Sequence, residues 1–289
     1  MSEAGTRILV LGASGMLGNA VLRVFHESAG FEAFGTTRSA ASLRHFHRAL
    51  HPQIISGVDV EQFDSLVMAF AQVRPHVVVN CIGVVKQRVE ADDALFAIPI
   101  NSVLPHRLAR LAQAVGARVV HVSTDCVFDG KKGMYTEADF PNAYDLYGRS
   151  KLLGEVDYEN AITLRTSIIG HELESTYGLV AWFLSQEVPV RGFSKAVFSG
   201  LPTVELARII RDAVLPNPSL RGLYHVSADP ITKYDLLCLI ADAYGRKNTI
   251  TPDDELVIDR SLDSTRFRAA TGYAPPSWSA LVRAMRDFG

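Results

Sequence analysis

The first half of the chain alternates short runs of β-branched, apolar residues with longer stretches whose apolar side chains recur at helical spacing. The short runs suit buried strands, and the longer stretches suit the helices that connect them. Strands are predicted over residues 7–11, 31–36, 53–56, 76–81, 118–122 and 162–165, and helices over residues 17–25, 61–73 and 101–115. Strands that alternate with helices form a parallel sheet, so we expect a Rossmann-type, doubly wound α/β fold.

The pattern changes after about residue 166, where the alternation weakens and proline and glycine accumulate. Helices are still predicted over residues 203–214, 232–244 and 278–288. A chain of 289 residues is long for one small domain and short for two large ones. We expect a Rossmann domain over residues 1–166 and a smaller, mixed α/β domain over residues 167–289, with part of the chain returning to the first domain.

Composition and charge narrow the class of partner. Hydrophobic residues make up 48% of the chain and the formal net charge is only −2, so nucleic acid and anionic membranes are not expected partners. The sequence lacks both a signal-peptide pattern and an apolar run of about 18 residues, so a cytoplasmic location is expected. The three cysteines are widely scattered, and His45 and His47 suit a solvated or packing role, so neither a disulfide framework nor a metal is expected.

A glycine-rich turn joins the first predicted strand to the first helix. Gly12 would permit the tight turn, Gly15 the approach of a phosphate, and Gly18 the packing of the helix on the strand. The amino terminus of a helix after such a turn suits the pyrophosphate of a dinucleotide, although glycines also mark plain turns. The expected dinucleotide contacts here are Gly12, Ser14, Gly15, Met16, Leu17 and Gly18.

Residues at the ends of the next strands indicate which dinucleotide binds. Arg38 follows the second strand where NAD-binding proteins carry an acid, and a guanidinium there can hold a 2'-phosphate. NADPH is therefore the expected cofactor, with NADH as the alternative. Asp59 and Val60 would lie near the adenine. A solvated arginine and a turn aspartate are the competing interpretations. The end of the fourth strand adds Cys81, Ile82 and Gly83 to the expected cofactor contacts.

Tyr147 and Lys151 stand four residues apart and would share one face of a helix. A neighbouring ammonium would lower the pKa of the phenol, which suits a tyrosine that exchanges a proton with a carbonyl or alcohol oxygen. Thr124 follows directly on the fifth strand, where its hydroxyl can hold the same oxygen, and Ser123 is the second choice. A turn or a helix cap is the plain alternative for these hydroxyls. Together the residues predict the acid–base half of a hydride-transfer site.

Three motifs carry a family resemblance: the glycine turn, Ser-Thr-Asp-Cys-Val-Phe-Asp-Gly at residues 123–130, and Tyr-Gly-Arg-Ser-Lys at residues 147–151. Residues 135–137, 154–155 and 164–167 extend the resemblance over most of the chain. The sequence resembles an extended short-chain dehydrogenase/reductase and is most similar to the dTDP-4-dehydrorhamnose reductase group. This resemblance implies NADPH-dependent reduction of the keto group of a nucleotide-diphosphate 4-keto-6-deoxy sugar. It also implies a homodimer.

The resemblance assigns a role to each candidate catalytic residue. Thr124 would orient the keto oxygen, Tyr147 would donate the proton, and Lys151 would tune the tyrosine and hold the nicotinamide ribose. Tyr147 and Lys151 are thus expected cofactor contacts as well. Ile168 stands where bacterial rhamnose-type reductases usually carry tryptophan, which favours a relative of the rhamnose precursor as the substrate.

A nucleotide-diphosphate sugar needs cations for its pyrophosphate, an apolar or aromatic slot for its base and polar groups for its hydroxyls. The substrate-binding candidates are Lys86, Thr124, Asp125, Trp182, Arg191, Ser264 and Arg266, with Arg260 beside them. Solvated arginines and a core tryptophan are the competing interpretations.

Two other functions stay open. In the similar GDP-fucose synthases a cysteine two residues past the catalytic hydroxyl acts as a base, and Cys126 stands two past Thr124, with His171 as the loosely placed acid. That reading makes the protein an epimerase/reductase of a nucleotide 4-keto sugar. A non-catalytic, NADP-binding regulatory subunit, known among relatives of the reductase group, is the alternative from a different class.

Overall fold

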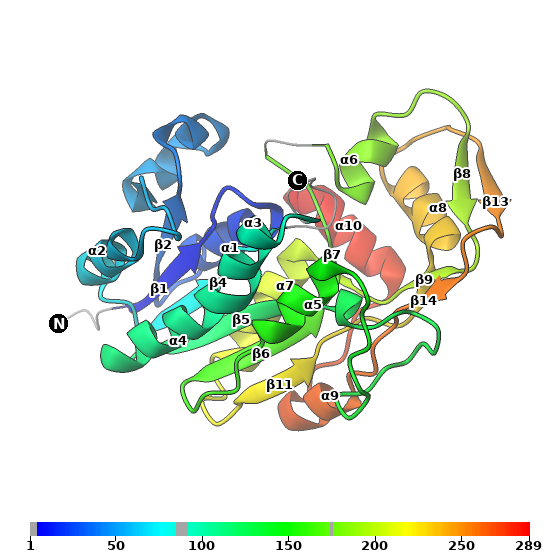
Figure 1. Ribbon diagram of the computed structural model, residues 1–289. Helices are drawn as coiled ribbons and strands as arrows, with labels where there is room; N and C mark the ends of the chain where they lie inside the picture. The colour runs from blue at the N-terminus through cyan, green and yellow to red at the C-terminus, as the bar shows by residue number, and fades with distance from the viewer. Residues whose placement is uncertain (1–4, 85–91, 174–175) are drawn as a thin grey trace.

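The computed structural model describes residues 5–84, 92–173 and 176–289. Its largest element is a parallel sheet of seven strands in the order β11-β6-β5-β4-β1-β2-β3 (Figure 1). The strands are β1 (Thr6–Leu11), β2 (Phe31–Thr37), β3 (Ile54–Ser56), β4 (Val77–Asn80), β5 (Arg118–Thr124), β6 (Ala161–Thr166) and β11 (Gly222–His225). The strand order reverses between β1 and β4, which confirms the doubly wound α/β fold. In such folds ligands bind at the carboxyl ends of the strands, beside the reversal.

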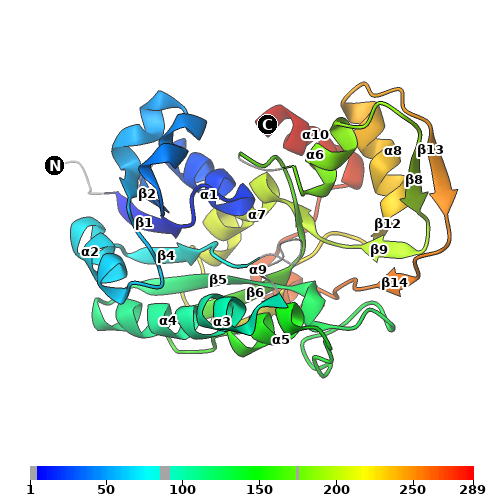
Figure 2. The same cartoon turned by 45° about the horizontal axis from the view of Figure 1, so that its top comes forward.

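Helices cover both faces of the sheet (Figure 2). Helices α1 (Met16–His26) and α7 (Thr203–Ile209) lie on one face, and α2 (Phe63–Val73), α4 (Leu104–Ala114) and α5 (Leu146–Leu153) lie on the other. Successive side chains of β1 point to opposite faces. Ile8 and Val10 join the core under α1, whereas Leu9 and Leu11 join the core under α2 and α4, and all four are fully buried. Burial on both faces explains why the strand sequences are continuously apolar.

The helix predicted over residues 101–115 begins as a wider π-helical turn, Ile98–Val103, and continues as α4. Pro105 has no N–H to offer the carbonyl of Asn101, so the α-helical bond between them cannot form. The Asn101 carbonyl is instead approached by Gly154, where a Cβ would lie only 1.9 Å from that oxygen. The irregular turn therefore lets the end of α5 pack closely against this helix.

The second half of the chain builds a smaller unit beside the carboxyl ends of the strands (Figure 1). Its strands are β7 (Ile168–Ile169), β8 (Val190–Phe193), β9 (Ala196–Phe198), β10 (Leu201–Pro202), β12 (Ile231–Thr232), β13 (Ile250–Asp253) and β14 (Ile258–Asp259). Its helices include α6 (Leu179–Leu184), α8 (Lys233–Ala243) and α10 (Trp278–Phe288), whereas α9 (Thr265–Thr271) packs against β11 of the large sheet. A separate core with Phe183, Leu236 and Met285 holds α6, α8 and α10 together.

Not all of the second half belongs to this unit. Strand β11 pairs with β6 in the large sheet, and α7 packs on α1, so the chain crosses back after residue 200. The division at residue 166 stays a prediction. Shorter elements include helix α3 (Ala94–Ala97) and 3₁₀ turns over Ala40–His45, Arg48–Gln53 and Asp125–Val127. Within the described ranges, each helix is too short or too polar for a membrane span.

Candidate active site

The turn between β1 and α1 brings backbone to the carboxyl edge of the sheet. Gly12 has a φ of +79°, a conformation that favours glycine, and the Gly15 N–H donates to the Gly12 carbonyl at 3.0 Å. A Cβ on Gly18 would lie 2.1 Å from the same oxygen, so the helix can lie this close only without a side chain there. Helix α1 has no side-chain cap, which leaves its first N–H groups available to an anion. The turn therefore fits a dinucleotide pyrophosphate.

The segment after β4 lies against this turn. A Cβ on Gly12 would lie 2.8 Å from Cγ1 of Ile82, and Gly83 beside it is exposed. Burial raises the pKa of the Cys81 thiol to about 12, with the charge of Lys151 acting in the opposite direction, so Cys81 is neutral. It is suited to line the wall of a cofactor site and not to react there.

Arg38 and Asp59 follow β2 and β3. Arg38 is exposed, and its side chain has no ion pair or hydrogen bond within the described part of the chain. Asp59 closes a turn, because its Oδ1 accepts the Glu61 N–H at 3.1 Å and its carbonyl accepts the Ser65 hydroxyl at 2.5 Å. The turn thus accounts for Asp59 without a ligand, and the adenine contact of Asp59 and Val60 stays a prediction.

Thr124 and Tyr147 meet where β5 ends and α5 begins. The hydroxyl of Thr124 donates to Oδ1 of Asp125 at 3.2 Å and accepts the Cys126 N–H at 3.1 Å. The same side chain lies close enough to the Tyr147 phenol to lower its pKa. Asp145 caps α5 by accepting the Gly148 N–H at 2.7 Å. A Cβ on Gly148 would lie 2.3 Å from the Cys126 carbonyl, so this glycine lets the helix rest on the Cys126 loop. That packing brings the phenol to the end of β5.

Lys151 lies one turn further along α5 and is only 5% exposed. Its Nζ donates to the Val122 carbonyl at 2.9 Å, and a Cβ on Gly83 would lie 3.7 Å from the same Nζ. Burial lowers the pKa of Lys151 to about 8, and the charge of Glu155 opposes this shift. The amine thus lies between the catalytic strand and the loop after β4, on the side of the glycine turn.

The expectation that Lys151 lowers the pKa of Tyr147 is wrong. Burial raises the pKa of the phenol, and the charges of Cys126 and Asp125 add to this, while the hydrogen bond with Thr124 opposes it. The physical reason is the orientation of Lys151, whose amine is directed to the Val122 carbonyl. A phenol with a raised pKa keeps its proton at neutral pH. It is also a weaker acid than a free phenol, so it gives up that proton less readily.

Asp125 is the substrate-binding candidate that lies directly beside Thr124. Burial raises the pKa of its carboxyl, with the charge of Arg260 as the largest opposing influence. The Nε of Arg260 donates to the Phe128 carbonyl at 2.8 Å, which holds this guanidinium against the segment after β5. Thr124, Asp125 and Arg260 therefore form one group at the end of this strand.

Three other substrate-binding candidates lie on separate elements. Arg191 on β8 forms an ion pair with Asp253, at 2.7 Å between Nη2 and Oδ2. Arg266 on α9 stacks over the ring of Tyr224 in the edge strand β11, 4.7 Å from its centroid. Trp182 on α6 is 38% exposed. The structure does not join these three to Thr124 by any contact within the described residues, and their substrate roles stay predictions.

Ser264, a further substrate-binding candidate, lies inside the protein, and its substrate role stays a prediction. It is 3% exposed, and its Oγ accepts from Ser227 at 3.0 Å and from the Nε of Arg268 at 2.9 Å. The hydroxyl is thus buried and already used inside the protein. Lys86 lies outside the described residues.

The sequence did not indicate several polar contacts that support the site. Ser123, the second-choice hydroxyl, donates to Oε1 of Glu155 at 2.7 Å and so serves a buried carboxylate. Asn101 accepts the Val84 N–H at 2.9 Å and donates to the Ser150 hydroxyl at 3.1 Å, which ties the loop after β4 to α5. Such hydrogen bonds depend on which distant segments the fold brings together, so residue spacing in the sequence does not predict them.

Cys126 and His171, the base and acid of the epimerase alternative, are engaged with different residues. Cys126 lies close enough to Tyr147 to raise the pKa of the phenol. His171, in contrast, bonds through Nε2 to the hydroxyl of Tyr244 at 2.8 Å, and burial lowers its pKa. The imidazole is thus engaged with the second unit of the molecule.

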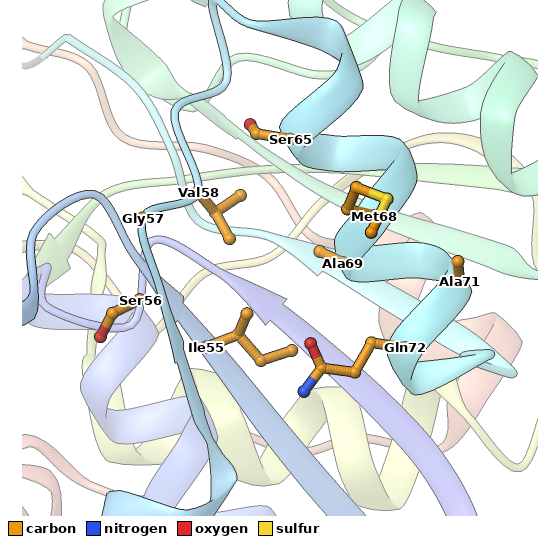
Figure 3. A pocket seen from close by; sticks show the side chains of 9 residues that line it. All are labelled: Ile55, Ser56, Gly57, Val58, Ser65, Met68, Ala69, Ala71 and Gln72. Atoms are coloured by element: carbon orange, nitrogen blue, oxygen red, sulfur yellow. The ribbon is translucent and has the colours of Figure 1, made fainter.

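Thr124, Tyr147 and Lys151 line neither of two cavities in the described part of the protein. An open groove of about 590 Å³ lies between β3 and α2, with Val58, Met68 and Gln72 in its walls (Figure 3). A cavity of about 220 Å³ runs from Met16 at the start of α1 to Phe288 at the end of α10. Among the residues that line these two spaces, Met16 is the one predicted to contact the cofactor.

Comparison with known families decides where the chain belongs. Residues 6–287 match the RmlD substrate binding domain. The chain belongs to this family. A dTDP-4-dehydrorhamnose reductase of Aggregatibacter actinomycetemcomitans is 24% identical over 307 residues, covering 98% of this chain and 99% of the relative. The resemblance to the reductase group that the motifs predicted is thereby confirmed.

A second type of relative carries another name. Methionine adenosyltransferase 2 subunit beta of Danio rerio is 33% identical over 258 residues, covering 83% of this chain and 74% of the relative. Among solved structures, dTDP-4-dehydrorhamnose reductase from Bacillus anthracis in complex with NADP has a TM-score of 0.79 at 20% identity and covers 99% of each chain. At that identity the likeness shows the fold alone.

Proposed function

We propose that the protein is an NADPH-dependent reductase of the keto group of a nucleotide-diphosphate 4-keto-6-deoxy sugar. The observation that carries the proposal is the close packing of Gly148 on the Cys126 loop, which brings the Tyr147 phenol near the Thr124 side chain, beside the buried amine of Lys151. A hydroxyl, a protonated phenol and a cation at the carboxyl edge of a Rossmann sheet suit the reduction of a carbonyl. The reductase relatives in the same family support this choice.

Each residue has a separate task in the proposed reaction. Thr124 holds the keto oxygen, and Tyr147 passes its phenolic proton to that oxygen as the carbonyl becomes an alcohol. When bound, NADPH supplies the hydride that the carbonyl carbon receives. Lys151 holds the nicotinamide ribose. Because burial raises its pKa, Tyr147 carries its proton at neutral pH, as the donor in this direction of the reaction must.

NADPH is proposed over NADH because of Arg38. Its exposed guanidinium has no partner within the described residues and follows the end of β2, where a 2'-phosphate would need a cation. The NADP complex of the Bacillus anthracis reductase supports the same choice. A nucleotide-sugar partner, a homodimer and a cytoplasmic location stay predictions.

The test is oxidation of NADPH, followed at 340 nm, with a panel of nucleotide-linked 4-keto-6-deoxy sugars. We expect turnover on at least one sugar and its loss by a factor of about 100 or more in Tyr147→Phe, which removes the proton donor. Tyr144→Phe is the matched control, because Tyr144 is 88% exposed three residues earlier. Binding of NADPH without turnover on any sugar contradicts the proposal.

The relatives named as subunits favour a second candidate function. At 33% identity, methionine adenosyltransferase 2 subunit beta supports a role in which this chain assembles with a methionine adenosyltransferase and does not reduce a sugar. Size-exclusion chromatography of this protein mixed with such an enzyme tests the idea. A stable complex that forms equally well with Tyr147→Phe supports this second function, whereas separate elution of the two proteins contradicts it.

A further inference from the structure

A buried ion pair lies behind the proposed catalytic residues. Arg165 on β6 donates from Nε and Nη2 to the two carboxylate oxygens of Glu155, at 2.7 and 2.6 Å. The side chains are 3% and 11% exposed. Burying two charges costs desolvation that their attraction often fails to exceed, so stability is a weak reason for such a pair. This prompts the question of what else the carboxylate does.

The carboxylate of Glu155 also contacts the strand that carries Thr124. Its Oε1 accepts the hydroxyl of Ser123 at 2.7 Å, next to Thr124 in β5. The preceding residue, Val122, accepts the amine of Lys151. Three consecutive residues of β5 are therefore involved: Val122 bonds to Lys151, Ser123 bonds to Glu155, and Thr124 carries the hydroxyl proposed to face the substrate.

The backbone around Glu155 is fixed as well. Gly154 packs so closely on Asn101 that a Cβ would lie 1.9 Å from the Asn101 carbonyl, and the Glu155 N–H donates to Leu152 at 3.2 Å. The carboxylate is thus held at the end of α5, whose preceding turn bears Lys151. Its position relative to the amine has little freedom.

Three titratable groups interact electrostatically with Lys151: Cys81 after β4, His121 on β5 and Glu155 after α5. Cys81 is neutral because burial raises its pKa to about 12. His121 is neutral too, because burial, followed by the charges of Lys151 and His106, lowers its pKa well below the usual value. Glu155, the third group, is the one that forms an ion pair with Arg165.

The far side of the ion pair is closed by other charged groups. The Nη1 of Arg165 lies 3.3 Å from Nε2 of His225, whose backbone N–H donates to Glu137 at 2.8 Å. Burial lowers the pKa of His225, and Glu137 is the largest opposing influence. Of the two partners in the ion pair, Glu155 is the one that shifts the pKa of Lys151.

We propose that Glu155 is a positioning residue of the active site, whose buried carboxylate braces the end of β5 and keeps the Lys151 amine protonated. The inference rests on the proposed function in one respect, namely that Lys151 holds the nicotinamide ribose. The role of Arg165 is then to offset the desolvation cost of burying this carboxylate. Removal of Glu155 alone leaves a buried arginine unpaired, which destabilises the protein. In this single variant, loss of stability therefore cannot be separated from a change in the pKa of Lys151.

The experiment therefore uses a pair of variants, Glu155→Gln and the double variant Glu155→Gln with Arg165→Gln, which removes both buried charges. The affinity for NADPH is measured by its fluorescence across a range of pH, and the melting temperature is measured in the same buffers. Glu159→Gln is the control, since Glu159 is 84% exposed and pairs loosely with Arg221 at 3.5 Å.

In the unmodified protein, affinity is expected to fall as the pH rises through about 8, where Lys151 loses its proton. Without Glu155 that midpoint should move about one pH unit or more lower. The shift should persist in the double variant although its melting temperature recovers relative to Glu155→Gln. Glu159→Gln should keep the original midpoint.

Return of the double variant to the original midpoint overturns the inference, because Glu155 would then act only as the partner of Arg165. A flat pH dependence in the unmodified protein overturns it as well. Turnover is recorded separately on the sugar panel. A shifted midpoint without turnover contradicts the reductase but supports this inference, whereas turnover with an unshifted midpoint does the reverse.

Discussion

The contact between Gly18 and Gly12 allows one prediction to be worked from the structure. In Gly18→Ala the new Cβ would start 2.1 Å from the Gly12 carbonyl oxygen, whereas ordinary van der Waals contact begins at 3.4 Å. Helix α1 and the turn must therefore separate by about 1.3 Å, the difference between the two distances. Overpacking of this kind typically costs about 1–3 kcal/mol, and a displacement of about 1 Å in a binding site can cost a factor of about 100.

Gly15→Ala is the matched comparison, because its Cβ would lie 3.3 Å from the same oxygen and needs only a small adjustment. Thermal unfolding and NADPH titration are measured for both variants. Gly18→Ala should lose several degrees in melting temperature as well as affinity, whereas Gly15→Ala should lose affinity with little change in melting temperature. An unchanged melting temperature in Gly18→Ala refutes the packing argument, and unchanged affinity in Gly15→Ala refutes the pyrophosphate site.

Three further outcomes follow from single side chains. Arg38→Ala should raise the KM for NADPH by about tenfold or more and leave that for NADH nearly unchanged, since only NADPH carries the 2'-phosphate; equal effects exclude Arg38 from the site. Steady-state turnover should fall as the pH rises through about 8, because burial lowers the pKa of Lys151 to that value, and a rate that stays constant well above it contradicts a role for the charged amine. Cys126→Ser should leave turnover largely intact, and loss of solvent proton exchange next to the keto group in this variant would favour the epimerase instead.

The periodicity of the sequence predicted the fold because it reflects burial directly. Strands such as β1 and β4 are buried on both faces, so their apolar runs are continuous and their ends fall within a few residues of the prediction. The irregular start of α4 was not predicted, since it depends on Pro105 together with the distant approach of Gly154. Strand β11 was not predicted either, because its side chains are half-buried at the edge of the sheet and lack a clear pattern.

The site shows the same division between local and long-range information. The structure places the side chain of Thr124 close enough to Tyr147 to influence the pKa of the phenol, and the catalytic roles of the two residues stay predictions. The pKa shift of Tyr147 could not be predicted from sequence positions. Helical spacing places Lys151 near Tyr147, but the direction of its amine is set by the Val122 carbonyl on another element. The burial of Ser264 was not foreseen, because burial of a serine leaves no trace in the sequence, and its substrate role stays a prediction.

The return of β11 to the large sheet has a consequence for dissecting this molecule. Strand β6 is buried along its whole length, and β11 covers its outer edge through pairs such as Leu223 with Thr163. A fragment that stopped at residue 166 would uncover that apolar edge and its unpaired backbone groups, a surface prone to association with other chains. We therefore expect either half, expressed alone, to aggregate.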